Sequence, residues 1–276
     1  LFGTNWVHIS GGEQTTTVLR ATGNLWAWGS NSSGSLGIGS TDNRSTPMQS
    51  GAAATWAQVA TGGTHTLALG TGGNLWAWGH NNTHGCLGVG DYNNRSSAAL
   101  VGTATSWVQI SAGMGFFSMG LQANGTLWTW GNNNEGSLGQ GTTTTLPSPT
   151  AVGTSTGWVQ ISAGYRHALA LKADGTVWAW GRNISGGRGG QLGLGDTAAR
   201  SIPVQVGTET SWVQVDAGEE HSAALKSDGT LWAWGKNQSG ELGLGDVADR
   251  SLPVQVGTLT GWLRISAASQ RTFALR

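Results

Sequence analysis

Four short runs of alternating apolar and polar residues recur along the chain. The first opens with tryptophan, as in Trp158–Ser162 (WVQIS), and the second is represented by Leu169–Leu171 within HALALK. The third reads LWAWG, as in Leu231–Gly235, and the fourth reads PVQVG, as in Pro253–Gly257. A period of two is typical of β-strands, and no stretch shows a helical period. The pattern therefore predicts an all-β fold.

The residues between the runs predict how the strands are connected. Asp174-Gly175 and Asp228-Gly229 lie between second and third runs, and Asp-Gly in that place is a strong hairpin signal. A polar loop carrying LGxG, such as Leu192–Gly195, separates the third run from the fourth. Pro203 and Pro253 open fourth runs, which suits an edge strand because proline has no backbone N–H to donate. Each set of four runs predicts one four-stranded antiparallel sheet.

The set repeats along the whole chain. Its copies open at Trp6, Trp56, Trp107, Trp158, Trp212 and Trp262, with spacings of 50, 51, 51, 54 and 50 residues. The fourth copy has four extra residues, Gly187–Gly190, in its polar loop. Four short strands in each period of about 50 residues are typical of β-propeller blades. We therefore predict a single β-propeller domain over residues 1–276.

The two ends predict a shared blade. Leu1–Thr4 aligns with Gln205–Thr208, so the chain begins in the last strand of a blade. It ends after Arg271–Leu275, the second strand of the sixth copy. We expect five complete repeats and a sixth blade built from both ends but lacking its third strand. Three alternatives remain open for the missing strand. The ring stays imperfect, the chain is part of a longer one, or another chain supplies the strand. Because the chain has no initiator methionine, we also expect a processed or trimmed product.

Composition and charge exclude several classes of protein. The chain carries 14 basic and 14 acidic side chains, and it has no basic stripe of the kind that nucleic-acid-binding proteins use. No run of 18 apolar residues predicts a membrane span. A single cysteine, Cys86, excludes an internal disulfide.

The repeat resembles a known family. Ala217–Gly257 reads AGEEHSAALKSDGTLWAWGKNQSGELGLGDVADRSLPVQVG, which is similar to the regulator of chromosome condensation repeat in a tryptophan-rich bacterial form. The resemblance covers essentially the whole chain and implies a propeller with four-stranded blades. Members of the family include a nucleotide exchange factor for a small nuclear GTPase, a plant ultraviolet photoreceptor, ubiquitin-ligase modules, and bacterial and phage surface proteins. Light sensing is not predicted, because only Gly164–His167 (GYRH) approaches the photoreceptor motif GWRHT.

Most conspicuous residues are predicted to have structural roles. All sixteen tryptophans stand at repeat positions, so we expect them to pack between and within blades. The repeat histidines His65, His167 and His221 are expected to hydrogen-bond their own turns and to bind no metal. Three DxxxR pairs are expected to pin the loop before the fourth strand: Asp91/Arg95, Asp196/Arg200 and Asp246/Arg250. We predict no catalytic set, no cofactor and no enzymatic activity.

Two sets of residues remain as candidate sites. Asn31, Asn81, Asn183 and Asn237 begin N-x-[ST] sequons at the WGxN position, so they are candidates for N-glycosylation. The alternative is that the repeat itself favours asparagine there, because asparagine suits turns. Candidate partner-binding residues come from irregular loops, since loops on rigid scaffolds often carry function. They are Tyr92, Phe116, Tyr165, Arg166, Asn183, Arg188 and Gln191.

The sequence favours a non-enzymatic propeller that serves in binding or assembly. Low charge and a Ser, Thr, Asn and Gly-rich surface predict an extracellular location, or one on a virion, cell or filament surface. The predicted partner is a protein or a second copy joined head to tail through the incomplete blade. One alternative is a nucleotide exchange factor for a small GTPase, which the resemblance alone implies. Another is a carbohydrate-binding adhesin, which would use Tyr92, Phe116 and Tyr165 to bind glycans.

Overall fold

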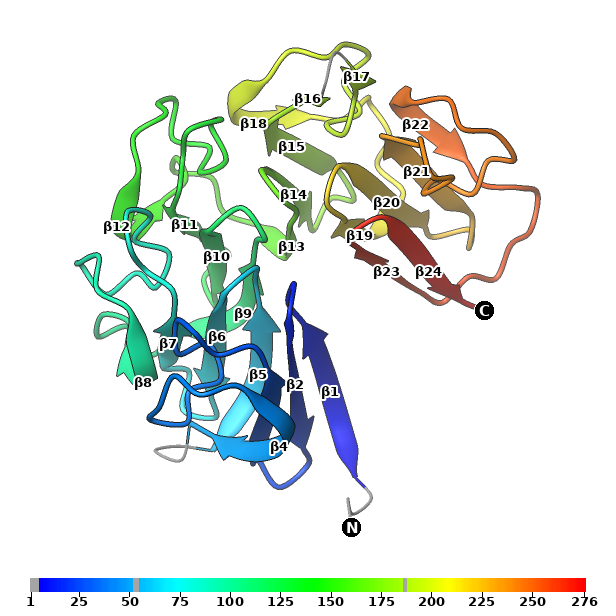
Figure 1. Ribbon diagram of the computed structural model, residues 1–276. Coiled ribbons are helices and arrows are strands. Elements are labelled where there is room, and N and C mark those ends of the chain that lie inside the picture. Colours follow the sequence, from blue (N-terminus) through cyan, green and yellow to red (C-terminus); the bar gives the residue numbers. More distant parts are fainter. Residues whose placement is uncertain (1–4, 52–54, 186–187) are drawn as a thin grey trace. The chain divides into compact units, whose positions relative to one another are not determined.

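The computed structural model describes residues 5–51, 55–185 and 188–276, and these residues form β-strands and turns. They contain five four-stranded antiparallel sheets and two two-stranded ones (Figure 1). Within these ranges no helix is long and apolar enough to cross a membrane. The all-β prediction and the five complete repeats are confirmed. Leu1–Thr4, the segment predicted to contribute to a shared blade, lies outside the described residues.

The chain divides into two compact units, the first of which holds repeats 1 to 3 except for Gly125–Leu127 and Asn133–Thr144. Repeat 1 comprises β1 (Trp6–Gly11), β2 (Thr15–Arg20), β3 (Leu25–Gly29) and β4 (Arg44–Ser50). Repeat 2 comprises β5 (Trp56–Thr61), β6 (His65–Gly70), β7 (Leu75–Gly79) and β8 (Arg95–Leu100). Repeat 3 comprises β9 (Trp107–Ala112), β10 (Phe117–Gln122), β11 (Leu127–Gly131) and β12 (Leu146–Ala151).

The second unit holds repeats 4 to 6 and the loop 133–144. Repeat 4 comprises β13 (Trp158–Ala163), β14 (His167–Lys172), β15 (Val177–Gly181) and β18 (Arg200–Gln205), and its enlarged loop adds the small hairpin β16 (Ile184–Ser185) and β17 (Arg188–Gly189). Repeat 5 comprises β19 (Trp212–Ala217), β20 (His221–Lys226), β21 (Leu231–Gly235) and β22 (Arg250–Gln255). Repeat 6 consists of β23 (Arg264–Ala268) and β24 (Arg271–Leu275).

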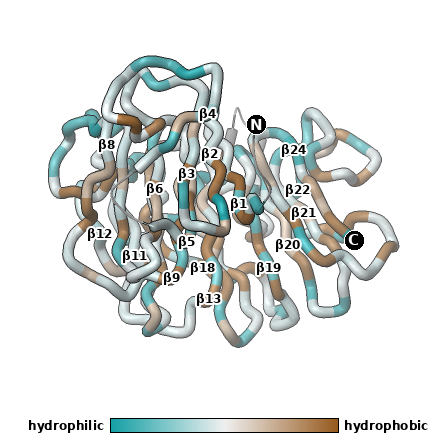
Figure 2. Tube along the Cα trace, turned by 90° about the horizontal axis from the view of Figure 1, so that it is seen from below, coloured by the Kyte–Doolittle hydropathy of each residue, from teal (hydrophilic) through white to brown (hydrophobic). Residues whose placement is uncertain are grey.

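Each complete sheet has the strand arrangement that the sequence predicts. In repeat 4 the order is β13-β14-β15-β18, so the proline-containing fourth strand lies at the edge. Gly175 turns the chain between β14 and β15 at a φ of +78°, a conformation that favours glycine. Asp174 Oδ1 accepts hydrogen bonds from Thr176 N at 3.0 Å and Thr176 Oγ1 at 2.6 Å, which closes the turn. Figure 2 shows most hydrophobic segments on the strands and mainly polar loops between them.

Consecutive repeats are joined by the second tryptophan of the third strand. Trp234 of repeat 5 is fully buried, and its Nε1 donates to the Gln191 carbonyl of repeat 4 at 2.9 Å. Its indole lies against Gly193, where a Cβ atom would come within 2.8 Å of Nε1. The same contact recurs within the units at Trp78 with the Ser35 carbonyl, Trp130 with that of Cys86 and Trp180 with that of Ser137, at 2.9–3.0 Å. Tryptophan packing between repeats is thus confirmed at these positions.

The buried histidines also join repeats, which corrects the expectation that they bond their own turns. Ser222 Oγ in β20 donates to the Gln191 carbonyl at 2.7 Å, which leaves its oxygen to accept from His167 Nε2 at 3.1 Å. His65 Nε2 contacts Ser118 Oγ, and His221 Nε2 contacts Thr272 Oγ1, in the same way. Burial lowers the pKa of His65 and His167 to about 3 and that of His221 to about 4. All three are therefore neutral at pH 7.

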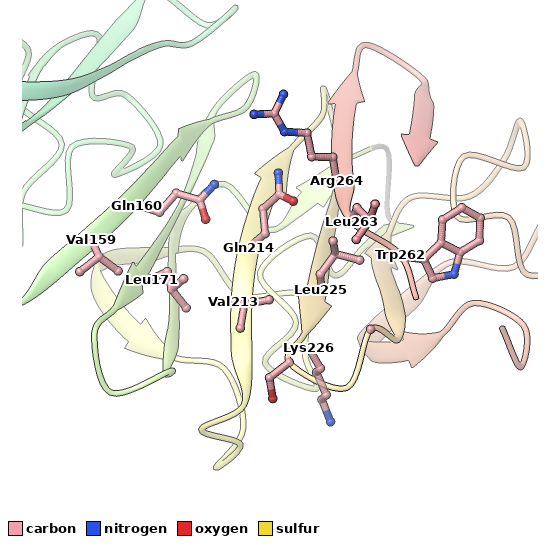
Figure 3. A pocket seen from close by; sticks show the side chains of 12 residues that line it. Val159, Gln160, Leu171, Val213, Gln214, Leu225, Lys226, Trp262, Leu263 and Arg264 are labelled. Carbon is pink, nitrogen blue, oxygen red and sulfur yellow. The ribbon is translucent and has the colours of Figure 1, made fainter. Parts of the chain in front are cut away.

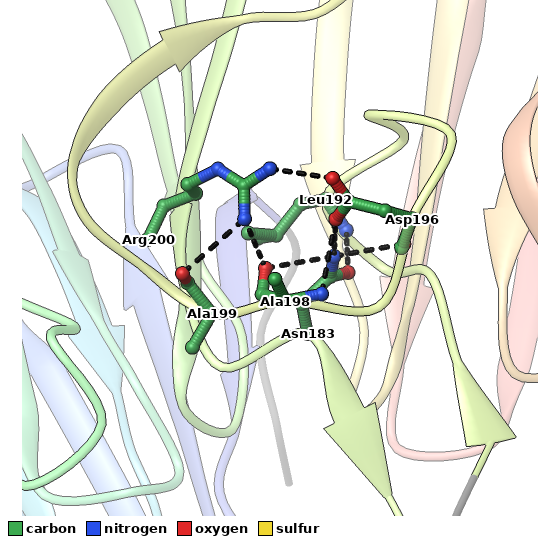
Figure 4. A network of polar contacts seen from close by, with 6 residues as sticks. All are labelled: Asn183, Leu192, Asp196, Ala198, Ala199 and Arg200. Carbon is green, nitrogen blue, oxygen red and sulfur yellow. Dashed lines mark hydrogen bonds and ion pairs between the residues drawn. The ribbon is translucent and has the colours of Figure 1, made fainter.

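The same pattern of hydrogen bonds closes the polar loop of each complete repeat. In repeat 4 the side chain of Asn183 donates from Nδ2 to the carbonyls of Asp196 and Ala198, and its Oδ1 accepts from Leu192 N at 3.0 Å (Figure 4). Arg200 reaches Asp196 Oδ2 at 2.6 Å, and this bond is the main cause of a lowered pKa for Asp196. Asp91–Arg95 and Asp246–Arg250 repeat the ion pair at 2.6 and 2.5 Å, so the prediction that these pairs pin the loop is confirmed.

Replacing the loop asparagine should destabilise the protein. Asn237→Ala removes two hydrogen bonds to carbonyls and leaves Leu242 N, which donates to Oδ1 at 3.0 Å, without its acceptor. We expect a loss of roughly 2–4 kcal/mol in the free energy of unfolding, because buried polar groups lose their partners. Chemical denaturation measures the loss. The exposed neighbour Gln238 is the control, and an equal loss for Gln238→Ala would contradict the assignment.

The histidines should make the protein sensitive to acid. Their pKa is lowered in the folded state, so their contribution to stability is complete above pH 6.5 and is lost as the pH falls toward 3. At pH 5 each of the two fully buried histidines should reduce the free energy of unfolding by about 2 kcal/mol relative to pH 7. Denaturation of His167→Gln at both pH values should show a smaller pH dependence than the parent protein. An unchanged pH dependence would exclude this titration as the cause.

Candidate functional site

Two of the predicted partner residues form a small aromatic and charged cluster in the second unit. Tyr165 and Arg166 lie in the turn between β13 and β14, and the Arg166 guanidinium lies 5.0 Å from the centre of the Tyr165 ring. Arg166 also approaches Glu135 Oε1 at 3.5 Å, from the loop of the preceding repeat. Both side chains are half-buried. The β13–β14 turn and the loop that holds Glu135 therefore form one surface patch. Arg166 partly covers the Tyr165 ring in this patch.

A second predicted residue, Phe116, belongs to an aromatic cluster in the first unit. Its ring stacks on His84 with ring centres 4.5 Å apart, and the His80 ring lies at 5.2 Å. Phe116 adopts a φ of +66°, which is unusual for a bulky residue. Partial burial and the nearby His84 lower the pKa of His80. The structure thus brings His80 and His84 of the polar loop 80–94 against the turn before β10, whereas Tyr92, further along the same polar loop, has 44% of its surface exposed.

Gln191 and the four sequon asparagines, which the sequence also predicts as site residues, are buried. Gln191 has 1% of its surface exposed, and its carbonyl accepts the hydrogen bonds of Ser222 and Trp234. The backbone of Arg188 pairs with Ser185, and the Arg188 side chain lies outside the described part of the structure. The four sequon asparagines, Asn31, Asn81, Asn183 and Asn237, are fully buried with their Nδ2 groups bonded to carbonyls. A glycan on Nδ2 would require these loops to open, which favours the alternative that asparagine serves the turn.

The first strands of repeats 4 to 6 line a pocket that the sequence reading did not single out. It has a volume of about 590 Å³. Figure 3 shows Val159 in β13, Val213 in β19 and Leu263 directly before β23, with exposed fractions of 52%, 53% and 70%. Alternation could have indicated this surface, because Val159 and Val213 each follow a buried tryptophan and point to the opposite side of their strands.

Amide side chains hold these first strands together. Gln160 Nε2 donates to the Val215 carbonyl at 3.1 Å, and its Oε1 accepts from Val215 N at 3.0 Å. Gln214 makes the same pair of bonds to Ile265. Arg264 replaces glutamine at this position in repeat 6, so the pocket combines an apolar wall with the cations of Arg264 and Lys226.

Charged groups beside the pocket are largely engaged with neighbours. Lys226 Nζ lies 4.1 Å from the centre of the Trp232 ring and bonds Glu209 Oε2 at 3.1 Å. Lys236, which does not line this pocket, bonds Glu220 Oε2 at 2.7 Å, and this bond raises the pKa of Lys236. Among the described residues, no group of three or more His, Cys, Asp or Glu side chains is placed to hold a metal ion. The apolar walls of the pocket, with glutamine amides that already bond the backbone, suit a partner that binds through van der Waals contacts.

Repeats at the two ends of the chain expose surfaces that are buried elsewhere. In the second unit, Phe273 and Leu275 of β24 are 56% and 60% exposed, whereas Ala223 and Leu225 at the same positions of β20 are 0% and 2% exposed. In repeat 5 the following repeat covers this face of the sheet, where Ala223 and Leu225 pack with Ile265 of β23, and within the second unit no repeat follows repeat 6.

The first unit shows the corresponding exposure on β1. Trp6 and Ile9 are 37% and 68% exposed, whereas Trp56 and Val59 of repeat 2 are 3% and 1% exposed. In repeat 2 the preceding sheet covers these positions, with contacts between β1, β2 and β5. Trp28 is likewise only half-buried, although its counterparts Trp78 and Trp130 are completely buried.

Comparisons with known proteins place this geometry in one family. The family model of the RCC1-like domain matches residues 1–274. The ultraviolet-B receptor UVR8 of Arabidopsis thaliana is 31% identical over 243 residues, which are 86% of this chain and 54% of that protein. The regulator of chromosome condensation of Xenopus laevis is 34% identical over 155 residues, which are 55% of this chain and 36% of that protein. The chain thus spans about half or less of the length of these relatives.

Solved structures show the same fold. Human WBSCR16 aligns with a TM-score of 0.85 and 24% identity, covering 98% of this chain and 71% of that one. Yeast RCC1 (Prp20), in a complex with Kap60, aligns with a TM-score of 0.84 and 23% identity, covering 98% and 67%. Both are propellers of the type that the resemblance implies, and the four-stranded repeats described above correspond to their blades. This chain belongs to the RCC1-like domain family.

Proposed function

We propose that this protein is a protein-binding and assembly propeller whose binding surfaces are exposed apolar positions of repeats 1 and 6. The observation that carries the proposal is the exposure of residues whose counterparts in complete repeats are buried. In the second unit these are Phe273 and Leu275, and in the first unit they are Trp6 and Ile9. Exposed apolar positions at a strand edge attract another polypeptide.

The character of the family supports a binding role. RCC1-like propellers are generally binding or scaffold domains, and the yeast relative was solved in complex with Kap60. Net charge is zero, so association would depend on apolar and backbone contacts more than on electrostatic steering. The simplest form is head-to-tail self-association, in which the face of repeat 1 in one copy meets the end of repeat 6 in another. The composition favours an extracellular location, or one on the surface of a virion, cell or filament.

The alternatives draw less support from the side chains. A carbohydrate platform needs exposed aromatic rings, and Phe116 is stacked on His84 while Tyr165 is partly covered by Arg166. Tyr92 remains as a single exposed ring. The exchange-factor alternative rests on the names of relatives, which cover this chain only in part.

Self-association tests the proposal. We expect the sedimentation coefficient to rise with protein concentration, and we expect Ile9→Arg and Phe273→Arg each to weaken the association by at least about tenfold, because each places a charge in the apolar contact. Leu252→Arg is the matched control, since Leu252 is 54% exposed in a complete repeat.

A protein that sediments as a monomer at all concentrations would rule out head-to-tail assembly. Equal weakening by Leu252→Arg would show that the contact lies elsewhere. Circular dichroism on each variant separates loss of association from loss of folding.

A further inference from the structure

The pocket on the first strands of repeats 4 to 6 is open because of the strand pattern, and not because a neighbour is missing. Val213 belongs to a complete repeat with a described repeat on either side in the second unit, yet 53% of its surface is exposed. Val108, at the same position of a complete repeat in the first unit, is 54% exposed. The exposed side chain at this position therefore belongs to the folded repeat.

The walls of this pocket offer an apolar surface on the scale of a small molecule. Leu171 and Leu225 line it and are only 4% and 2% exposed, so they form its deep part. Gln160 and Gln214 also line it, but the hydrogen bonds between first strands already use their Oε1 and Nε2 atoms. The volume of about 590 Å³ lies within the range of small-molecule sites, on the order of 300–1,000 Å³. A bound molecule would thus meet apolar side chains and amides that are already bonded.

The charged groups of the pocket are all of one sign. The described residues that line it include Lys226 and Arg264 and no acidic side chain. Figure 3 shows these two cations at opposite ends of the pocket, with Val213 and Leu225 between them. An apolar surface that ends in a cation suits a molecule that combines an apolar body with an anionic group.

Lys226 is already engaged. Its Nζ bonds Glu209 Oε2 at 3.1 Å, and its side chain is 11% exposed. The same Nζ lies 4.9 Å and 4.1 Å from the ring centres of Trp212 and Trp232. Arg264 is exposed, and no carboxylate oxygen of the described residues lies within 4.0 Å of its guanidinium nitrogens. The guanidinium is therefore the group to which an anion would bind.

Arginine at this position cannot do what glutamine does there. Glutamine stands at this position in repeats 2 to 5, and in repeats 2, 4 and 5 its Oε1 accepts a backbone N–H of the following first strand. A guanidinium has five N–H donors and no acceptor, so Arg264 cannot take part in the same pair of bonds. It can instead hold a carboxylate through two parallel N–H···O bonds.

We propose that this pocket binds a small amphipathic carboxylate, with its apolar chain against Val213 and Leu225 and its carboxylate on Arg264. A free aliphatic acid fits better than a polypeptide, because a peptide backbone brings N–H and C=O groups that need partners. The glutamine amides along the wall are not available for them. The inference is independent of the proposed self-association, which uses other side chains.

Octanoate and octanol test the proposal by isothermal titration calorimetry. The two molecules share an apolar chain, and only the acid can pair with a guanidinium. We expect octanoate to bind one-to-one and at least about tenfold more tightly than octanol. No saturable binding of octanoate, or equal affinity for octanol, would overturn the proposal. Saturable binding of an acetylated Leu-Leu-Glu tripeptide amide without binding of octanoate would indicate a protein partner and would also reject it.

Variants at the cation identify the group that binds the carboxylate. Arg264→Gln should remove the preference for octanoate over octanol, whereas Arg264→Lys should retain most of it because the positive charge remains. Arg271→Gln is the matched control, since Arg271 is an exposed arginine of the same repeat that does not line this pocket. A preference that survives Arg264→Gln, or that Arg271→Gln removes equally, would show that the carboxylate does not bind at Arg264.

A charge on the wall tests the apolar part of the pocket. Val213→Glu should weaken octanoate binding by at least about tenfold, because it places a carboxylate against the apolar chain. Leu252→Glu makes the same change at a 54% exposed position of the same repeat outside the pocket and should leave octanoate binding unchanged. Both positions are exposed, so both variants should fold, and circular dichroism checks this. Unchanged binding in Val213→Glu would place the ligand elsewhere.

Discussion

One carbonyl oxygen in each polar loop links a repeat to the next. The carbonyl of Gln191 accepts the indole N–H of Trp234 and the hydroxyl of Ser222, and Ser222 in turn accepts from His167. Two side chains of repeat 5 thus converge on one backbone group of repeat 4, and His167 joins them through Ser222. Gly193 leaves room for the indole. The asparagine of the same loop fixes this carbonyl by bonding the next backbone N–H, that of Leu192. Without the loop, the tryptophan would lose both its wall and its acceptor.

This arrangement makes every repeat depend on its neighbours. A sheet buries its first-strand tryptophan and its third-strand tryptophan only when an adjacent repeat covers them, as in other repeat proteins. Trp78 is completely buried, while Trp28 at the same position of repeat 1 is only half-buried. The exposure of Trp28 follows from the same rule that buries its counterparts in repeats 2 and 3. The proposed binding surfaces are therefore places where the repeat interaction is incomplete.

A sequence pattern was not sufficient to assign the hydrogen-bond partners of some single residues. The sequon asparagines matched a modification motif, yet their amides close the polar loops from inside. The histidines suggested bonds within a turn, but strand pairing turns their rings toward the following repeat. In both cases the residue type was compatible with several partners. The partner was selected by a contact about 10 to 55 residues away along the chain, which a local pattern does not encode.

The sequence by itself determined the all-β class, the 50-residue period, the hairpin turns and the edge position of the proline strands. These features depend on local chemistry: alternation of apolar residues, Asp-Gly at turns, and the missing N–H of proline. Tertiary structure alone decided which side chains meet between repeats, and thereby located the pocket beside Val213. A pocket depends on which strands lie side by side, and that is a property of neighbours in space.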